Sequence, residues 1–323
     1  MWRQLDIFLN DKLITTAETT YSYKAILDML LNTSSDVKET KLQAQMFYRD
    51  RNIGLSSADD PITGTNFGLV TRSQFFQKSR IVDMEGPLLA SECQLDRYLL
   101  NGIKLGIKLY PSTDAFRLVS PIDDAEFKVV ITGASLKVCC VTPTPDVLVA
   151  HQAVLNEDKK AYYPYMRSEM KKFTMAQGQF SVDLDDVFLG KIPSQLTLCM
   201  VKSEALSGSY ALNPFHFKNY KTNFVNASID GESFPGKALQ MVFNDESYTG
   251  NYIDAYLRMF EPKDRASENG ISRVEFAQGH TIFCFDFNPD LKEGTDKSWP
   301  LLRRGNLHLE IHFAELCQKP PPY

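Results

Sequence analysis

The sequence lacks the features that mark membrane and secreted proteins. Its 323 residues contain no apolar run near the 20 or so residues that a helix needs to cross a bilayer, so we expect no membrane insertion. The start, Met-Trp-Arg-Gln-Leu-Asp, has no basic segment followed by a long apolar run, so we expect no signal peptide. Six cysteines occur without a CxxC pair, mostly in apolar runs, which predicts small buried thiols in a reducing intracellular compartment, cytoplasm or nucleus.

A basic excess is also missing. The chain carries 35 Lys and Arg against 40 Asp and Glu, a formal net charge of −5. Proteins that wrap nucleic acid gain most of their affinity by neutralising phosphates with basic side chains. The composition therefore argues against direct, sequence-specific nucleic-acid binding.

Catalytic signatures are equally scarce. The sequence has no phosphate-binding GxxxxGK[ST] loop, no GxGxxG loop and no GxSxG nucleophile elbow, and it has only five histidines. We therefore expect no enzyme, and assign no catalytic residue, no metal ligand and no cofactor.

One histidine cluster leaves an enzymatic alternative open. His308, Glu310 and His312 alternate with Leu307, Leu309, Ile311 and Phe313, so a strand would place the three polar side chains on one face. Imidazole and carboxylate groups are good ligands for divalent metals, which permits a metal-dependent, cupin-like enzyme. The competing interpretation is an ordinary strand whose polar face contacts water.

A second alternative is a glycan-binding β-sandwich. Tyr162, Tyr163 and Tyr165 lie close together, and exposed aromatic rings can stack on sugars. The same tyrosines could instead pack between two halves of the chain.

What the sequence does contain is strand-forming pattern. It is 43% hydrophobic and 23% charged, with 21 Phe and 14 Tyr, a composition typical of a globular protein rich in β-structure. Alternation predicts a hairpin that turns at Asn10-Asp11 and another at Asp230-Gly231. Helical spacing or a favourable first-turn proline predicts helices at 21–31, 145–157 and 248–260. Further strands are expected at 79–89, 103–110, 127–132, 136–141, 165–174, 179–184, 195–201, 222–229, 281–287 and 306–313, and an irregular surface loop at 50–80.

The same order of features occurs twice. A strand ending in a tight turn is followed by a tyrosine-rich amphipathic helix, first at Tyr21 and again from Tyr248. Later in each half, two leucines precede a glycine turn, Gly102 or Gly305, and then a strand with one apolar face. A repeat this long indicates a domain duplication, because solenoid periods are only about 20–50 residues.

The duplication predicts two related β-sandwiches that meet near 156–160. The second half has about four strand candidates before its hairpin turn, whereas the first half has almost none. Because a sandwich cannot lose strands without exposing edges and core, we expect the first strands of the first unit and the last strand of the second unit to be missing.

Four segments resemble the double jelly-roll major capsid proteins of nucleocytoplasmic large DNA viruses and Polinton (Maverick) transposons. They are the stretch 2–13 with the helix that follows, Asp96-Arg97-Tyr98-Leu99-Leu100-Asn101-Gly102, the stretch 208–217, and the stretch 282–289 with Gly305-Asn306-Leu307. The resemblance covers nearly the whole chain, although no single motif is diagnostic.

The resemblance implies a mainly all-β fold of two tandem jelly rolls, residues 1–157 and 158–323. It also implies a structural role in a virion: a homotrimer forms a pseudo-hexagonal capsomer that contacts neighbouring capsomers and a minor (penton) capsid protein. The long loop at 50–80 would supply tower or inter-subunit contacts. A truncated or domesticated genomic copy, which would be intracellular, is consistent with the departures at both ends.

Overall fold

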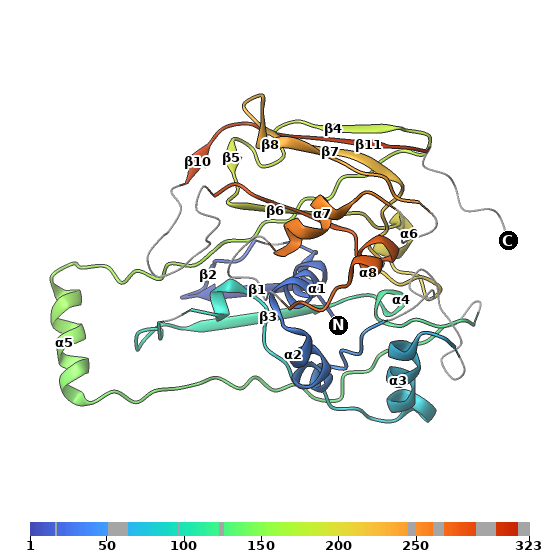
Figure 1. Cartoon of the computed structure of the whole chain (residues 1–323). Coiled ribbons are helices and arrows are strands. Elements are labelled where there is room, and N and C mark those ends of the chain that lie inside the picture. The colour runs from blue at the N-terminus through green and yellow to red at the C-terminus, as the bar shows by residue number, and fades with distance from the viewer. Residues whose placement is uncertain are drawn as a thin grey trace.

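The computed structural model describes residues 1–16, 18–50, 64–95, 97–122, 126–244, 250–260, 268–288 and 302–315. Within these ranges the protein is rich in antiparallel sheet and its helices are short, as expected for a mainly β fold (Figure 1). No helix in the described part of the chain is both long and apolar enough to cross a membrane.

The strands are short and unevenly distributed. Those of the first half are β1 (Trp2–Leu9), β2 (Lys12–Leu13) and β3 (Leu105–Pro111). The second half contributes β4 (Ser181–Leu184), β5 (Lys191–Ile192), β6 (Gln195–Cys199), β7 (Thr222–Ile229), β8 (Glu232–Gln240), β9 (Ile282–Asp286), β10 (Arg303–Arg304) and β11 (Leu307–Phe313).

The helices connect and cover these strands. They are α1 (Tyr21–Asn32), α2 (Ser35–Glu39), α3 (Phe67–Phe76), α4 (Asp114–Arg117), α5 (Pro145–Asn156), α6 (Ser203–Ser207), α7 (Ile253–Leu257) and α8 (Arg273–Gln278), with 3-10 turns at Lys41–Gln45, Gln77–Ser79, Ser91–Cys93 and Arg258–Phe260. The expected helices at 21–31 and 145–157 are confirmed as α1 and α5. The expected helix at 248–260 is shorter, and its first residues, 248 and 249, lie outside the described residues.

The second half holds the main core. A four-stranded sheet, β4-β11-β7-β8, lies above the β6-β9 pair (Figure 1). Apolar side chains of both sheets belong to one buried cluster. Along β11, Leu307, Leu309, Ile311 and Phe313 are buried while the residues between them are partly exposed. The alternation predicted for this strand is therefore confirmed.

The first half holds a much smaller sheet, β2-β1-β3, whose core centres on Leu5, Ile7 and Ala90. Helix α1 lies between this sheet and the second half. Its buried residues belong to the main core, and the ring of Tyr23 packs edge-on against those of Phe116 and Phe215, at 5.9 and 5.5 Å between centroids.

The hairpins of the two halves have the same sheet order and register. In β2-β1-β3 and in β8-β7-β11, the first strand of the hairpin is flanked by its return strand and by a later strand, all antiparallel. The last hairpin residue before the turn pairs with the first residue of the later strand: Leu9 with Leu105, and Ile229 with Leu307.

The two turns are also held alike. The N–H of Asn10 donates to the Lys104 carbonyl at 2.9 Å, and that of Asp230 donates to the Asn306 carbonyl at 3.0 Å. In return, the Lys104 N–H donates to Asn10 Oδ1 at 2.9 Å and the Asn306 N–H donates to Asp230 Oδ1 at 2.8 Å. Asn10 and Asp230 both have positive φ, 50° and 51°, which asparagine and aspartate tolerate better than most residues.

This shared geometry predicts matched effects of mutation. Asn10→Ala and Asp230→Ala should each lower the free energy of unfolding by about 1–2 kcal/mol, because each loses the Oδ1 that accepts a backbone N–H and a residue type suited to positive φ. Chemical denaturation measures both, with Asp11→Asn as a control that keeps the turn chemistry and should change stability by less than about 0.5 kcal/mol. A large loss in one variant and none in its counterpart would contradict the equivalence of the turns.

The prediction of a strand is wrong for four segments. Residues 79–89, 127–132, 136–141 and 165–174 are described and belong to no sheet. The last three lie in a long excursion, residues 126–180, which we call the arm: it runs out from the body to α5 and returns (Figure 1). Their apolar and β-branched residues favour extended backbone, but a strand also needs a partner, and no described residue pairs with them.

The cysteine expectation is wrong in part for the same reason. Cys284 is buried and Cys199 partly so, but Cys93, Cys139 and Cys140 are exposed. Cys139 and Cys140 belong to the arm, so their apolar surroundings in sequence do not become a core. Cys317 lies outside the described residues.

The loop expected at 50–80 is also only partly irregular. Residues 51–63 lie outside the described part, but 67–76 form α3, which begins where Asn66 Oδ1 accepts a hydrogen bond from the Leu69 N–H at 3.3 Å. A cap of this kind satisfies one of the free N–H groups at the start of a helix.

Candidate interaction surface

The open edge of β3 is the first part of a candidate interaction surface. In the second half, β11 is paired on both sides, with β7 and with β4. The corresponding strand of the first half, β3, pairs with β1 alone among the described residues and ends its sheet. A strand edge of this kind presents unpaired N–H and C=O groups to any extended segment that approaches it.

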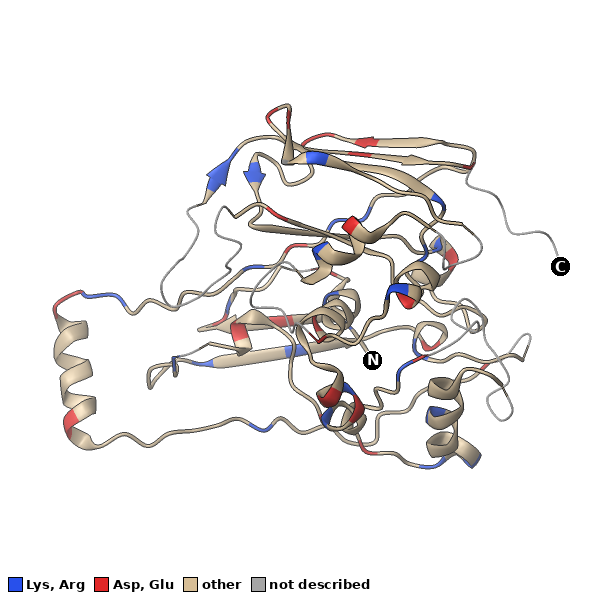
Figure 2. Cartoon of the chain, viewed as in Figure 1, with Lys and Arg blue, Asp and Glu red and all other residues tan. Residues whose placement is uncertain are grey.

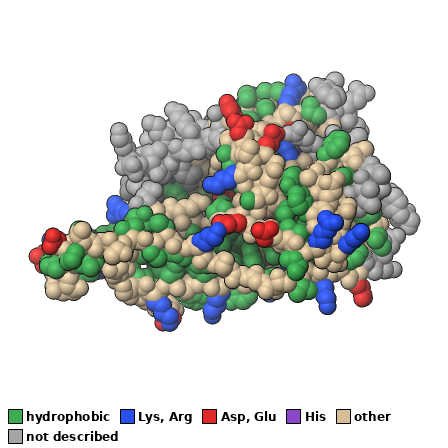
Figure 3. Space-filling view, turned by 90° about the horizontal axis from the view of Figure 1, so that it is seen from below, with side chains coloured by type: hydrophobic (Ala, Val, Ile, Leu, Met, Phe, Trp, Pro, Cys, Tyr) green, Lys and Arg blue, Asp and Glu red, His purple; other side chains and the backbone are tan. Residues whose placement is uncertain are grey.

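The arm is the second part. Fourteen of the 28 exposed large hydrophobic side chains that the structure describes fall within residues 126–180. Helix α5 buries none of its residues, and its Val149 is 70% exposed. In the view from below, the arm projects from the body and hydrophobic side chains cover much of it (Figure 3). Contiguous apolar exposure on this scale is typical of a surface that binds another molecule.

Charged residues do not account for the exposure of the arm. Both basic and acidic residues occur at scattered points along the ribbon, and most of the arm carries neither (Figure 2). Its extended stretches at 130–143 and 159–179 make no described backbone–backbone hydrogen bonds. A polar, water-exposed linker would not need so many Val, Leu and Phe side chains, so the arm is better suited to contact than to spacing.

Side chains hold the arm to the body at a few points. The Leu100 N–H donates to Tyr163 Oη at 3.1 Å, and Arg97 Nη1 donates to the Tyr162 carbonyl at 3.0 Å. Lys137 Nζ lies 2.6 Å from Glu85 Oε2 in an exposed ion pair. Exposed pairs contribute little to stability, so these contacts tether the arm without covering it. Met170 and Met175 pack against the main core, whereas 14 large apolar side chains of the arm stay exposed.

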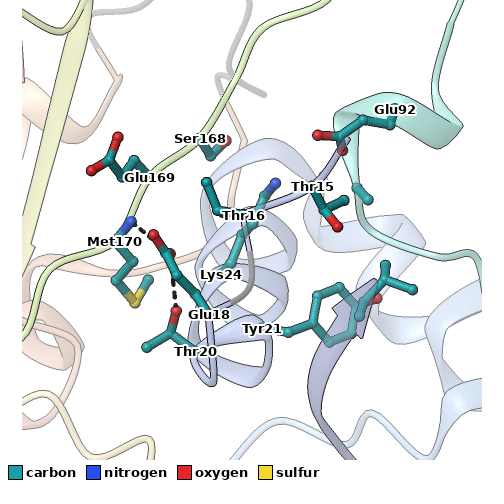
Figure 4. A pocket seen from close by; sticks show the side chains of 12 residues that line it. Thr15, Thr16, Glu18, Thr20, Tyr21, Lys24, Glu92, Ser168, Glu169 and Met170 are labelled. Atoms are coloured by element: carbon teal, nitrogen blue, oxygen red, sulfur yellow. Dashed lines mark hydrogen bonds between the residues drawn. The ribbon is translucent and has the colours of Figure 1, made fainter. Parts of the chain in front are cut away.

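A small pocket marks the place where the arm returns to the body (Figure 4). Its volume is about 70 Å³. Glu18, from the segment that leads into α1, points at the returning chain, and its Oε2 accepts hydrogen bonds from the Met170 N–H at 3.2 Å and from Thr20 Oγ1 at 3.5 Å. The remaining lining residues are Leu5, Thr15, Thr16, Tyr21, Lys24, Ala90, Glu92, Ser168 and Glu169.

The chemistry of this pocket indicates an anchor for the arm. Ligand pockets usually enclose about 300–1,000 Å³, several times the space found here. Glu18 uses its carboxylate to cap a backbone N–H of the arm, and the nearby Glu169 pairs with Lys171 at 2.9 Å. We therefore assign the pocket a structural role: its residues fix the position at which the arm rejoins the body.

The histidine cluster is on one face of β11, as its alternation predicted. His308 Nδ1 lies 2.6 Å from Asp185 Oδ1, and His312 Nε2 lies 2.9 Å from Glu310 Oε1. The ring of His312 also stacks on that of Phe224, with centroids 4.8 Å apart. In the described part of the chain, no three His, Cys, Asp or Glu side chains are grouped so that they could hold a metal ion.

The tyrosines considered for glycan stacking lie on the returning part of the arm. Tyr162 is 72% exposed, but the hydroxyl of Tyr163 is engaged with the backbone of Leu100. Tyr163 and Arg97 thus fasten the arm to the loop at 97–100, an arrangement that sequence reasoning did not anticipate. The repeated order of features was the available signal for the open edge of β3, and the run of Val and Leu from 129 to 155 was the signal for the arm.

Comparison with known proteins leaves the family open. The chain is 24% identical over 322 residues to F54H12.2, an uncharacterized protein of Caenorhabditis elegans, and the match covers 99% of this chain and 73% of that protein. No family model and no solved structure matches the chain.

Proposed function

We propose that the chain is a structural, non-catalytic subunit of a self-assembling shell, a major capsid protein of the double jelly-roll type. Two related β-sandwich units, 1–157 and 158–323, make up each copy, and three copies form a capsomer. Its partners are other copies of itself, neighbouring capsomers and a minor (penton) capsid protein. It needs no cofactor, and it resides in a virion or, if encoded by a host genome, inside the cell.

One observation carries the proposal: the two hairpin units share sheet order, register and turn hydrogen bonds. The pair formed by Ile229 and Leu307 lies more than 200 residues further along the sequence than the corresponding pair formed by Leu9 and Leu105. Any two hairpins could share a turn type, because Asx-rich turns with positive φ are common. A shared third strand in the same register, fixed by the same pair of backbone and side-chain hydrogen bonds, favours duplication of a whole unit.

Duplication has a direct consequence for assembly. Two similar units in one chain, repeated by a three-fold axis, present six similar bodies around a ring, which can tile a surface as hexagons do. The apolar arm and the open β3 edge supply surfaces for contacts between copies. The near balance of charges, 35 basic and 40 acidic, suits a protein whose main contacts are with protein.

Negative-stain electron microscopy of the purified chain tests the proposal. We expect particles of uniform size that average to a three-fold ring with a pseudo-hexagonal outline. Class averages that show only isolated single chains, at micromolar concentration and at low and physiological salt, would contradict it. A divalent metal bound stoichiometrically in native mass spectrometry would instead favour the enzymatic alternative at His308, Glu310 and His312.

A further inference from the structure

The second half of the chain shows what would complete the first sheet. Strand β4 pairs antiparallel along β11, with Val182 opposite Ile311 and Leu184 opposite Leu309. Through the common register, Ile311 and Leu309 correspond to Leu109 and Ile107 of β3. A strand placed on β3 as β4 is placed on β11 would therefore run antiparallel along Ile107–Tyr110.

The arm contains a segment with the pattern of β4. Strand β4 reads Ser-Val-Asp-Leu, a serine followed by an apolar, a charged and an apolar residue. Residues 135–138 read Ser-Leu-Lys-Val, the same pattern. In the register of β4, Leu136 would lie opposite Leu109 and Val138 opposite Ile107. Those two β3 residues are only partly buried and pack at the border of the small Leu5–Ile7 core, so the added side chains would extend it.

We propose that residues 135–138 of one copy add as a strand to the open β3 edge of a second copy, and that this exchange joins the subunits. The proposal rests on the self-assembly proposed above and names the contact that produces it. One chain carries both the open edge and the unpaired strand, so each copy gives its arm to one neighbour and receives the arm of another. Such a head-to-tail contact closes into a ring when the rotation between copies allows it.

The size of the apolar surface suits a second copy of the chain. Eleven large hydrophobic residues between Phe127 and Leu155 are 39–70% exposed in the single chain. Together they offer on the order of 500 Å² of apolar surface, taking about half of a Val or Leu side chain as exposed. A standard stable interface buries about 800 Å² per partner, of which roughly 60% is apolar. The arm thus supplies the apolar share of one side of such an interface.

The register also brings two like charges together. Lys137 would lie opposite Lys108 on the outer face of the extended sheet, as Asp183 lies opposite Glu310 in the second half. Directly opposed like charges destabilise a strand pair, and an opposite pair stabilises it. Lys137→Glu should therefore tighten self-association about two- to five-fold, and adding Lys108→Glu should reverse the gain.

Cross-linking tests the register directly. Two copies of unequal mass, both carrying Cys93→Ser, Cys139→Ser and Cys140→Ser to remove the exposed native thiols, are mixed, one with Leu109→Cys and the other with Leu136→Cys. Mild oxidation should yield a product with the summed mass of the two copies. Moving the second cysteine to Leu302, which is 80% exposed and remote from the arm in sequence, should abolish that product.

Light scattering distinguishes a failure of the strand exchange from a failure of the self-assembly proposed above. Wild type should be oligomeric, Leu136→Asp with Val138→Asp should be monomeric, and Leu302→Asp should remain oligomeric. Both arm residues are exposed in the single chain, so thermal unfolding should confirm that the variant folds. An oligomeric arm variant without the cross-link would overturn the strand exchange alone. A monomeric wild type would overturn the shell function and the exchange with it.

Discussion

Replacing Phe276 with alanine is expected to lower the free energy of unfolding by about 3–5 kcal/mol. Phe276 on α8 is fully buried, and its ring lies 5.8 Å from that of Tyr256 and 5.9 Å from that of Tyr252, measured between centroids. Phe283 on β9 and Phe243 surround it at 6.4 Å. Removal of the ring leaves a cavity in the core that supports the second half, and neighbours packed this closely cannot fully collapse into it.

Urea denaturation followed by fluorescence measures the loss. Phe173→Ala is the matched control, because the same side chain is 52% exposed on the arm. Its removal should change stability by less than about 0.5 kcal/mol in the single chain. Equal losses in the two variants would contradict the division into a packed body and an unpaired arm.

Acid should weaken the contact between the halves through His280. His280 is 7% exposed, and burial, reinforced by the charge of Arg49, lowers its pKa from 6.5 to about 4. The carboxylates of Glu275 and Asp50 oppose this shift, and His216 adds to it. Arg49 comes from the first half and pairs with Glu275 of α8 at 2.7 Å, so the group lies where the two halves meet.

The sign of the effect follows from the two protonation states. Between pH 6.5 and about 4 the unfolded chain binds a proton on His280 that the folded chain excludes. Stability contributed by neutral His280 is therefore complete above pH 6.5 and is lost as the pH falls toward 4. The expected loss between pH 7 and pH 5 is about 2 kcal/mol.

Unfolding free energies at pH 7, 6 and 5 for wild type and His280→Gln test this expectation. The variant should lose less stability on acidification by about that amount. Above pH 5 the carboxyl of Glu275 remains ionised: burial raises its pKa, but hydrogen bonds from Ser272 and the charge of Arg49 outweigh burial and lower it overall. His151→Gln, which removes an exposed histidine of α5, is the matched control. Parallel curves for wild type and His280→Gln would refute the role of His280.

Local chemistry made parts of the fold predictable from sequence. The Asn10-Asp11 and Asp230-Gly231 turns were predicted because these residues accept positive φ, and the structure has all four there. Helix α5 was predicted from Pro145, whose ring suits the first turn. These features depend on a few neighbouring residues, so the sequence contains nearly all the information that determines them.

Strand pairing was less predictable because it depends on distant segments. Residues 127–132 and 136–141 have the composition of strands, yet no partner lies beside them in the described chain. Alternation reports which face of a strand would be buried, not whether another strand is present to pair with it. The open edge of β3 and the arm are both consequences of pairing, so composition alone could not reveal them as one surface.

Two missed helices did leave signals. Ser272 and Glu275 form a reciprocal capping box at the start of α8, the Ser-x-x-Glu pattern that precedes many helices. Asn66 caps α3 in a similar way, but the polar composition of residues 50–65 obscured it. Both helices are short, and their apolar periodicity is too brief to be recognised without the cap.

The mass of the native particle tests the account most directly. Mass photometry and native mass spectrometry of the intact chain, over a concentration series, should give a species of three times the 36.6 kDa chain mass. A single species of 36.6 kDa that persists up to the highest concentration would contradict assembly by this chain.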